Sequence, residues 1–155
     1  MVSTHPQYSK IYPELVKLLN QVLVLSSGSK GLIQIYDALS ETLKVAASQG
    51  VGNEFLSAFS AIRAFDPTAC GRCLGLKIPI VIDDVMQDKA LLFFKHLINL
   101  EHIHSVCAMP LFDREKKVVG VISVYFSKTQ YMLSGNREIP EDYLFQIMDL
   151  LMKLK

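Results

Sequence analysis

The sequence predicts an α+β fold in which helices cover an antiparallel sheet. Two pairs of apolar segments, each pair joined by a short polar turn, predict β-hairpins over residues 31–48 and 103–126. Segments in which apolar residues recur at helical spacing flank and separate these hairpins. Hairpin-linked strands beside helices are typical of an antiparallel sheet in an α+β sandwich. The chain has 155 residues, which is enough for one core, and we expect a single domain over residues 1–155.

The first half of the chain is expected to form a helix, a hairpin and two short helices. The helix spans residues 10–25, and Pro13 is tolerated because it falls in the first turn. Strands follow over residues 31–37 and 42–48. Asn53 is expected to cap a short helix, and a further helical turn follows over residues 69–74. One apolar stripe runs along the first helix: Ile11, Leu15, Leu18, Val22 and Leu25.

The second half is expected to contain a strand, a helix, the long hairpin and a final helix. The strand covers residues 78–82, and Asp88 is placed to cap a helix over residues 89–99. A charged turn, Asp113–Lys117, joins the two strands of the hairpin. The last helix starts at about Pro140, which suits a first helical position. Its apolar residues again form a stripe: Leu144, Ile147, Leu151 and Leu154.

The two terminal stripes allow two uses. Each stripe can pack on the outer face of the sheet, or the two helices can pair with a second copy of the chain. A few buried leucines at about 1.5–3 kcal/mol each are enough to hold a dimer. We therefore expect a homodimer formed through the terminal helices.

The composition excludes several classes of protein. Half of the residues are apolar and 20% are charged, which is typical of a globular chain. The 16 Lys and Arg residues nearly balance the 15 Asp and Glu residues, which argues against nucleic acid as a partner. No apolar run reaches the length of a membrane span, and the N-terminal residues lack the apolar core of a signal peptide. With three cysteines, an odd number, we expect free thiols, no structural metal and a cytoplasmic location.

Several motifs occur in an order that resembles a known family. The first hairpin contains Gln34-Ile35-Tyr36-Asp37 and then Leu43-Lys44-Val45-Ala46-Ala47, and it is followed by Gly50, Phe55-Leu56 and Phe59. Three further motifs are ACGRCL at residues 69–74, IVIDDV at residues 80–85, and Ser105-Val106 with Pro110-Leu111. This series resembles the GAF domains that occur with bacterial histidine kinases.

The resemblance implies a fold and a function. The fold is a five- to six-stranded antiparallel sheet with the terminal helices on one face and short helices and loops on the other. The core would cover about residues 31–126, with flanking helices at about 10–25 and 140–154. The function is that of a non-catalytic, small-molecule-sensing domain of a bacterial signalling protein, and a histidine kinase is a candidate partner. The signatures of cyclic-nucleotide-binding and bilin-attaching members are absent, so no particular cofactor is implied.

The same resemblance places a ligand pocket between the sheet and the short helices. The residues expected there are mostly apolar, which favours an uncharged or planar ligand. Arg72 and Asp83 are candidates to orient one polar end of it. The strand at residues 105–111 presents alternate side chains to opposite faces, and the sequence leaves open which set faces the pocket. The expected ligand-binding residues are Phe55, Phe59, Cys70, Cys73, Asp83, Phe94 and Cys107.

Four alternatives remain open at this point. Cys70, Cys73 or Cys107 could serve a free methionine sulfoxide reductase, although the GAF proteins with this activity have a wider cysteine spacing. The pocket could be vestigial in a protein that only forms dimers. Zinc could be held by two cysteines and two histidines if their segments meet, with the ligand set Cys70, Cys73, His102 and His104. The carboxylates of Asp83 and Asp84 could bind a metal, but at a strand end they more often cap backbone N–H groups.

Overall fold

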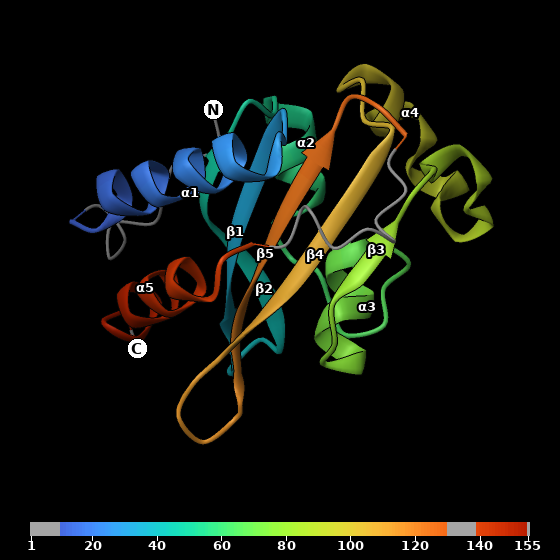
Figure 1. The fold of residues 1–155 in the computed structure, drawn as a ribbon. Coiled ribbons are helices and arrows are strands. Elements are labelled where there is room, and N and C mark those ends of the chain that lie inside the picture. The colour runs from blue at the N-terminus through green and yellow to red at the C-terminus, as the bar shows by residue number, and fades with distance from the viewer. Residues whose placement is uncertain (1–9, 130–138, 155) are drawn as a thin grey trace.

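The computed structural model describes residues 10–129 and 139–154. Five strands form one antiparallel sheet in the order β2-β1-β5-β4-β3 (Figure 1). The strands are β1 (Lys30–Asp37), β2 (Thr42–Gln49), β3 (Ile80–Ile82), β4 (Ser105–Phe112) and β5 (Val118–Phe126). The helices are α1 (Tyr12–Ser26), α2 (Asn53–Ala58), α3 (Ala69–Leu76), η2 (Val85–Gln87), η3 (Lys89–Phe94), α4 (Lys95–Leu100) and α5 (Glu141–Met152).

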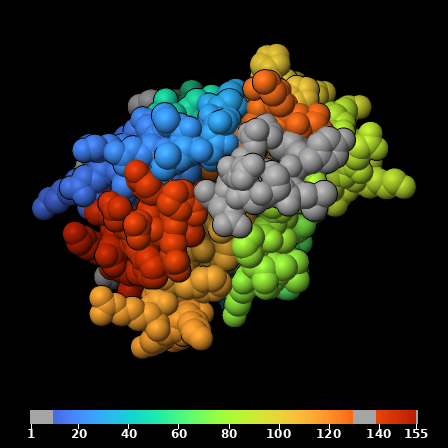
Figure 2. Space-filling model, viewed as in Figure 1, coloured from blue at the N-terminus to red at the C-terminus, as the bar shows by residue number. Residues whose placement is uncertain are grey.

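The helices divide between the two faces of the sheet. Helices α1 and α5 lie side by side over one face, as the blue and red segments of Figures 1 and 2 show. The short helices α2, α3, η2, η3 and α4 belong to the other face, where a second apolar cluster forms. This arrangement confirms the predicted α+β fold and the predicted placement of the terminal helices.

The apolar stripes of the terminal helices pack against their own sheet. Leu15, Leu18 and Val22 of α1, and Ile147 and Leu151 of α5, belong to one buried cluster with β1, β4 and β5. Leu25 does not follow the predicted stripe, because it is 51% exposed while Leu19 and Leu23 are buried instead. Since the sheet already covers these stripes, they are not available to a second copy. A homodimer stays a prediction, which the exposed residues Val24, Leu25 and Phe145 would have to support.

Three local predictions need correction. Asn53 is the first residue of α2 rather than its cap, because Gly52 occupies the capping position and no side chain caps this helix. Asp88 does cap the next segment, where its carboxylate accepts a hydrogen bond from Ala90 N–H at 3.1 Å. That segment is a 3₁₀ helix, η3, followed by α4, and not one helix. Pro140 stands at the capping position of α5 rather than inside it.

The sheet register decides which side chains of β4 face each layer. Cys107 and Leu111 pack in the cluster under α1 and α5. Val106 and Ala108 pack in the cluster under the short helices. The sequence leaves open which set of β4 side chains faces the pocket, and the structure shows that it is the set containing Val106 and Ala108.

The sheet divides at one end. The pairing of β1 with β5 stops at Ile35–Gly120. Both hairpins continue beyond that pair, β1–β2 to Asp37–Thr42 and β4–β5 to Phe112–Val118. The β4–β5 turn therefore projects alone from the sheet, at the lower end in Figure 1. Within the described residues, none of the helices has the length and apolar character that crossing a bilayer requires.

Candidate ligand-binding site

A small cavity lies between the sheet and the short helices. Its volume is about 30 Å³, which is room for a water molecule or a methyl group but not for a metabolite. Residues 85–100, comprising η2, η3 and α4, cover it and are called the roof below. The lining residues come from α2, α3, the roof and the sheet, and nearly all are apolar: Phe55, Phe59, Thr68, Ala69, Cys70, Val85, Leu91, Phe94, Ile98, Ile103, Val106 and Tyr125.

Aromatic rings form one wall of the cavity. Phe55 of α2 and Phe59, the residue directly after that helix, stack with ring centres 4.1 Å apart. The rings of Tyr125 from β5 and Phe55 meet in a T-shaped contact with centres 5.3 Å apart, and the ring centre of Phe94 from the roof lies 5.8 Å from that of Phe59. Phe94 is only partly buried, and Phe93 beside it is 89% exposed. Some rings of this wall thus belong to the sheet and to the α2 region, and Phe94 belongs to the roof.

Two buried polar side chains, Gln34 and Ser123, lie on this face of the sheet. Gln34 of β1 is fully buried, and its Nε2 donates to the backbone oxygen of Phe59 at 3.0 Å. Gln34 Oε1 has no hydrogen-bond partner among the described residues. The hydroxyl of Ser123 lies beside that of Tyr125, and the hydrogen bond between them acts to lower the pKa of Tyr125, against the larger effect of burial. Ser123 of β5 pairs with Leu32 of β1, and Gln34 is the next residue of β1 whose side chain points to the same face as Leu32. The side chains of Ser123 and Gln34 are therefore diagonal neighbours on the sheet. An unsatisfied buried acceptor costs about 1–3 kcal/mol, and a ligand or water that hydrogen-bonds there recovers it.

The three thiols are buried and weakly acidic. Burial raises the pKa of Cys70 to about 11, although hydrogen bonds from Thr68 and Gln34 oppose the shift. Burial likewise raises the pKa of Cys73 to about 12 and that of Cys107 to about 11. A thiol acts as a nucleophile only when it is deprotonated. The raised pKa values leave all three thiols protonated at neutral pH.

A partly buried ion pair fixes the far end of the roof. Glu101, directly after α4, accepts from Lys30 Nζ at 2.7 Å through its carboxylate and again through its backbone oxygen. Its second carboxylate oxygen accepts from Gly52 N–H at 2.8 Å. Lys30 opens β1, four residues after α1 ends. We call the contacts of Glu101 with Lys30 and Gly52 the Glu101 latch. The latch joins the end of the roof to the start of β1, just after α1, and to the start of α2.

The structure brings together some of the predicted site residues and separates others. Phe55, Phe59, Cys70 and Phe94 all line the cavity. Cys73 is buried in the surrounding cluster without lining the cavity, and Asp83 lies outside it between β3 and η2. The placement of Cys107 at the pocket is corrected. Its side chain points to the opposite face of the sheet, under α1 and α5, because side chains alternate along β4.

Other predicted polar groups are engaged elsewhere. The guanidinium of Arg72 binds both carboxylate oxygens of Asp88, at 2.9 and 2.8 Å, and also the backbone oxygen of Pro67. Arg72 therefore stabilises the start of η3, where Asp88 lies, rather than orienting a ligand. Asp84 caps η2 by accepting from Met86 N–H at 3.0 Å, as expected for a carboxylate at a strand end.

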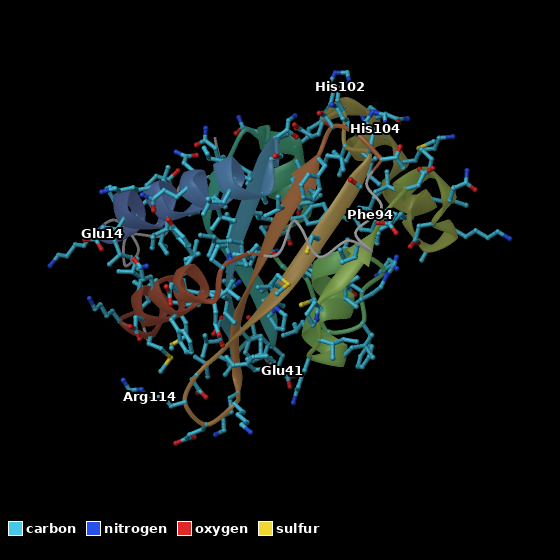
Figure 3. All side chains as sticks on the ribbon, viewed as in Figure 1. Glu14, Glu41, Phe94, His102, His104 and Arg114 are labelled. Carbon is cyan, nitrogen blue, oxygen red and sulfur yellow. The ribbon has the colours of Figure 1, made fainter. Side chains whose placement is uncertain are left out.

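The four candidate zinc ligands do not assemble. His102 and His104 are exposed at the end of the sheet near α4, well away from α3 in Figure 3. Within residues 10–129 and 139–154, no three His, Cys, Asp or Glu side chains come close enough to hold a metal ion. The cysteine pair of α3 and the histidine pair before β4 belong to separate parts of the fold.

Sequence reasoning missed Gln34, Ser123 and Tyr125. Gln34 is a polar residue between Leu32 and Tyr36, which share its face of β1, and Ser123 holds the same position between Val121 and Tyr125. A lone polar residue at an inward position of an apolar strand is the signal that could have found them. Burial raises the pKa of Tyr125 well above its usual value, so its hydroxyl remains a neutral donor.

Comparisons with known proteins agree with this architecture. The family model of the GAF domain matches residues 9–147. No curated protein matches the chain. Among solved structures, the GAF domain region of a Geobacter sulfurreducens PCA protein superimposes with a TM-score of 0.73 at 16% identity, covering 94% of this chain and 95% of that one.

Two further solved structures have different described activities. A domain of a protein described as a two-component sensor histidine kinase, from Sinorhizobium meliloti 1021, gives a TM-score of 0.61 at 15% identity, covering 98% of this chain and 89% of that one. The type II free methionine-R-sulfoxide reductase of Thermoplasma acidophilum gives 0.69 at 14% identity, covering 96% and 94%. At these identities the likeness concerns the fold alone. The family match extends over most of the sequence, and the chain belongs to the GAF domain family.

Proposed function

We propose that this chain is a regulatory GAF domain that binds a small, mostly apolar molecule in the cavity beneath the roof and is not an enzyme. The observation that carries the proposal is the apolar, aromatic-walled cavity between the sheet and the short helices. Gln34 does not line this closed cavity, but its Oε1 is buried next to it, beside Phe59, without a partner among the described residues, and an opened site would expose it to the ligand. The matching ligand has a planar or compact apolar body and one hydrogen-bond donor for Gln34 Oε1. The protonated thiols, and a set of described lining residues that contains no charged side chain, argue against chemistry there.

Ligand entry requires the roof to move, because a cavity of about 30 Å³ is smaller than any metabolite. Small-molecule sites occupy about 300–1,000 Å³, so the described state is closed. The roof is the part of the lining that can yield, since two of its large apolar residues, Leu92 and Phe93, face solvent rather than the core.

Movement of the roof would reach α1 through the Glu101 latch. The latch joins the end of α4 to Lys30. Two residues before Lys30, the N–H of Gly28 donates to Leu23 O of α1 at 2.9 Å. Ligand binding would thus alter the connection between α1 and the sheet. A signalling partner such as a histidine kinase and a cytoplasmic location remain predictions of this proposal.

Phenol and toluene form a matched pair of probes for the site. They have nearly the same shape, and only phenol carries a donor. We expect phenol to raise the melting temperature of the wild-type protein more than toluene does at equal concentration. In Gln34→Met the two probes should act alike, because the buried acceptor is gone and a net hydrogen bond contributes about 0.5–1.5 kcal/mol.

Two buried cysteines supply the control for this experiment. Cys70→Met adds volume at the cavity and should abolish the stabilisation by phenol, whereas Cys107→Met adds the same volume on the other face and should preserve it. Failure of both probes to stabilise the wild type would contradict the proposal. So would equal losses of phenol binding in the two methionine variants.

A free methionine sulfoxide reductase is the second candidate, because one such enzyme shares the fold and Cys70 lines the cavity. We expect no turnover of free methionine-R-sulfoxide with dithiothreitol at pH 7.5, since the thiols are protonated and buried. The measurement is methionine release followed by chromatography, with Cys70→Ala as the blank. Release that depends on Cys70 would make the protein an enzyme.

A further inference from the structure

A second hollow, of about 450 Å³, opens where the two hairpins separate. It begins beyond the last β1–β5 pair, Ile35–Gly120, and is enclosed by the β4–β5 turn on one side and by the end of α3 on the other. Both flanking segments, orange and green, lie at the lower end of the molecule in Figure 2. We call this hollow the hairpin groove. Its volume lies within the range of about 300–1,000 Å³ that is usual for small-molecule sites.

Positive charge gathers in the hairpin groove. Lys77 caps the C-terminus of α3, and Lys116 and Lys117 come from the β4–β5 turn. Asp113 is the one carboxylate among the described lining residues, and its Oδ1 is held by the N–H groups of Glu115 and Lys117 at 2.8 and 2.9 Å. The whole chain has a net charge of only +1, so this concentration is local.

The nearby carboxylate does little to neutralise the lysines. Glu115 approaches Lys117 at 3.6 Å, but both side chains are about three-quarters exposed. Such surface pairs contribute about 0–1 kcal/mol and are screened by salt. Figure 3 places Arg114 on the outer side of the same turn, away from α3, and places Glu41 between the turn and α3; neither residue lines the groove. The groove therefore favours an anionic ligand.

The aromatic ring of Phe65 lines the same groove as these lysines and is exposed to solvent, although its backbone conformation is strained. Phe65 is 67% exposed and has φ of 68°, in the left-handed region that bulky residues rarely adopt. The conformation costs about 1–3 kcal/mol and is held by a hydrogen bond from Phe65 N–H to Gly71 O at 2.9 Å. The ring lies against Gly75, where an added Cβ would stand 2.7 Å from it. The hydrogen bond to Gly71 and the space left by Gly75 thus keep the ring at the groove instead of in the core.

From these observations we propose that the hairpin groove binds a small molecule that carries both a planar ring and a phosphate or carboxylate group. The ring stacks on Phe65, and Lys77, Lys116 and Lys117 hold the anion. An ammonium–phosphate contact is a charge-assisted hydrogen bond, about twice as strong as a neutral one. This site is separate from the cavity beneath the roof, whose lining contains none of these residues.

The test uses 1-naphthyl phosphate as the probe, with 1-naphthol and inorganic phosphate as its two halves, followed by isothermal titration at low salt. We expect the whole probe to bind at least about tenfold more tightly than either half, because ring and anion contacts add when both are made. Amide hydrogen exchange should slow in residues 64–77 and 113–118. Protection of residues 55–59 and 91–98 instead would assign the probe to the cavity beneath the roof and overturn the groove.

Matched variants decide between a built site and general electrostatic attraction. Lys77→Gln/Lys116→Gln/Lys117→Gln should weaken probe binding by about tenfold or more, whereas the control Lys89→Gln/Lys95→Gln/Lys128→Gln removes equal charge elsewhere and should stay within about twofold. Equal weakening in both triple variants would overturn the proposal. These lysines are exposed, so neither variant should lose its fold.

Phe65→Gly separates a binding role from a structural one. Glycine accepts a positive φ without strain, so the melting temperature should stay the same or rise while the probe loses at least about fivefold in affinity. Unchanged affinity, or clear destabilisation of the fold, would show that the ring serves packing and would contradict the proposal.

Discussion

Glu101→Ala is expected to lower the free energy of unfolding by about 3 kcal/mol at pH 7. Glu101 is 6% exposed, and its carboxylate accepts from Lys30 Nζ and Gly52 N–H. Its removal leaves the partly buried ammonium of Lys30 without its counter-charge, with only the backbone oxygen of residue 101 as an acceptor. Breaking a buried pair by removing one charge costs about 3–5 kcal/mol, and partial exposure of Lys30 places this site at the lower end. Urea unfolding followed by circular dichroism measures the loss.

Glu115→Ala is the matched control. It removes the same kind of side chain from an ion pair with Lys117, but that pair is exposed, and the expected change is within about 0.5 kcal/mol. Equal effects of the two substitutions would mean that the Glu101 latch contributes no more than a surface ion pair.

The latch also predicts a dependence on acid pH. Burial raises the pKa of Glu101, but hydrogen bonds from Lys30 and Gly52 and the charge of Lys30 outweigh it, and the net shift is below the usual 4.5. A depressed folded-state pKa stabilises the fold above about pH 4.5, and this contribution is lost as pH falls through the folded value. The difference in stability between the wild type and Glu101→Ala should therefore shrink below that pH.

The protein is expected to become much less stable between pH 9 and 11. The thiols of Cys70, Cys73 and Cys107 have pKa values raised from 9.0 to about 11, 12 and 11, because burial disfavours the thiolate. The unfolded chain releases these protons first, so stability is complete below pH 9 and is lost as pH rises toward the folded values. Each pKa unit corresponds to about 1.4 kcal/mol, which gives about 2–3 kcal/mol for each thiol by pH 11.

Comparison with a variant that lacks the thiols isolates their contribution. Cys70→Ala/Cys73→Ala/Cys107→Ala should start from a lower stability at pH 8, because the core loses three sulfur atoms, but should decline less steeply with pH. Lysines and tyrosines titrate in both proteins, so the difference between the two slopes reports the cysteines. Urea unfolding under a phosphine reductant measures both. Parallel declines from pH 8 to 10.5 would show that the buried thiols contribute nothing to the alkaline transition.

The sequence by itself determined the layers of this protein and most of its elements. Apolar periodicity located α1, both hairpins and α5, because period 2 and period 3.6 put different side chains on one face. The order of motifs from Gln34 to Leu111 indicated the GAF domain family, which the family model confirms. Phe55, Phe59, Cys70 and Phe94 were placed at the cavity from sequence and resemblance alone.

The tertiary structure alone decided what depends on contacts between distant segments. Cys107 faces away from the cavity because the register of β4 between β3 and β5 fixes its side, and sequence parity defines two sets without assigning either. Arg72 forms an ion pair with Asp88, and Glu101 forms one with Lys30, which is 71 residues away in the sequence. No local sequence pattern reveals either pairing. The hairpin groove likewise exists only because β1 and β5 separate after Ile35 and Gly120, leaving room between elements that are remote in sequence.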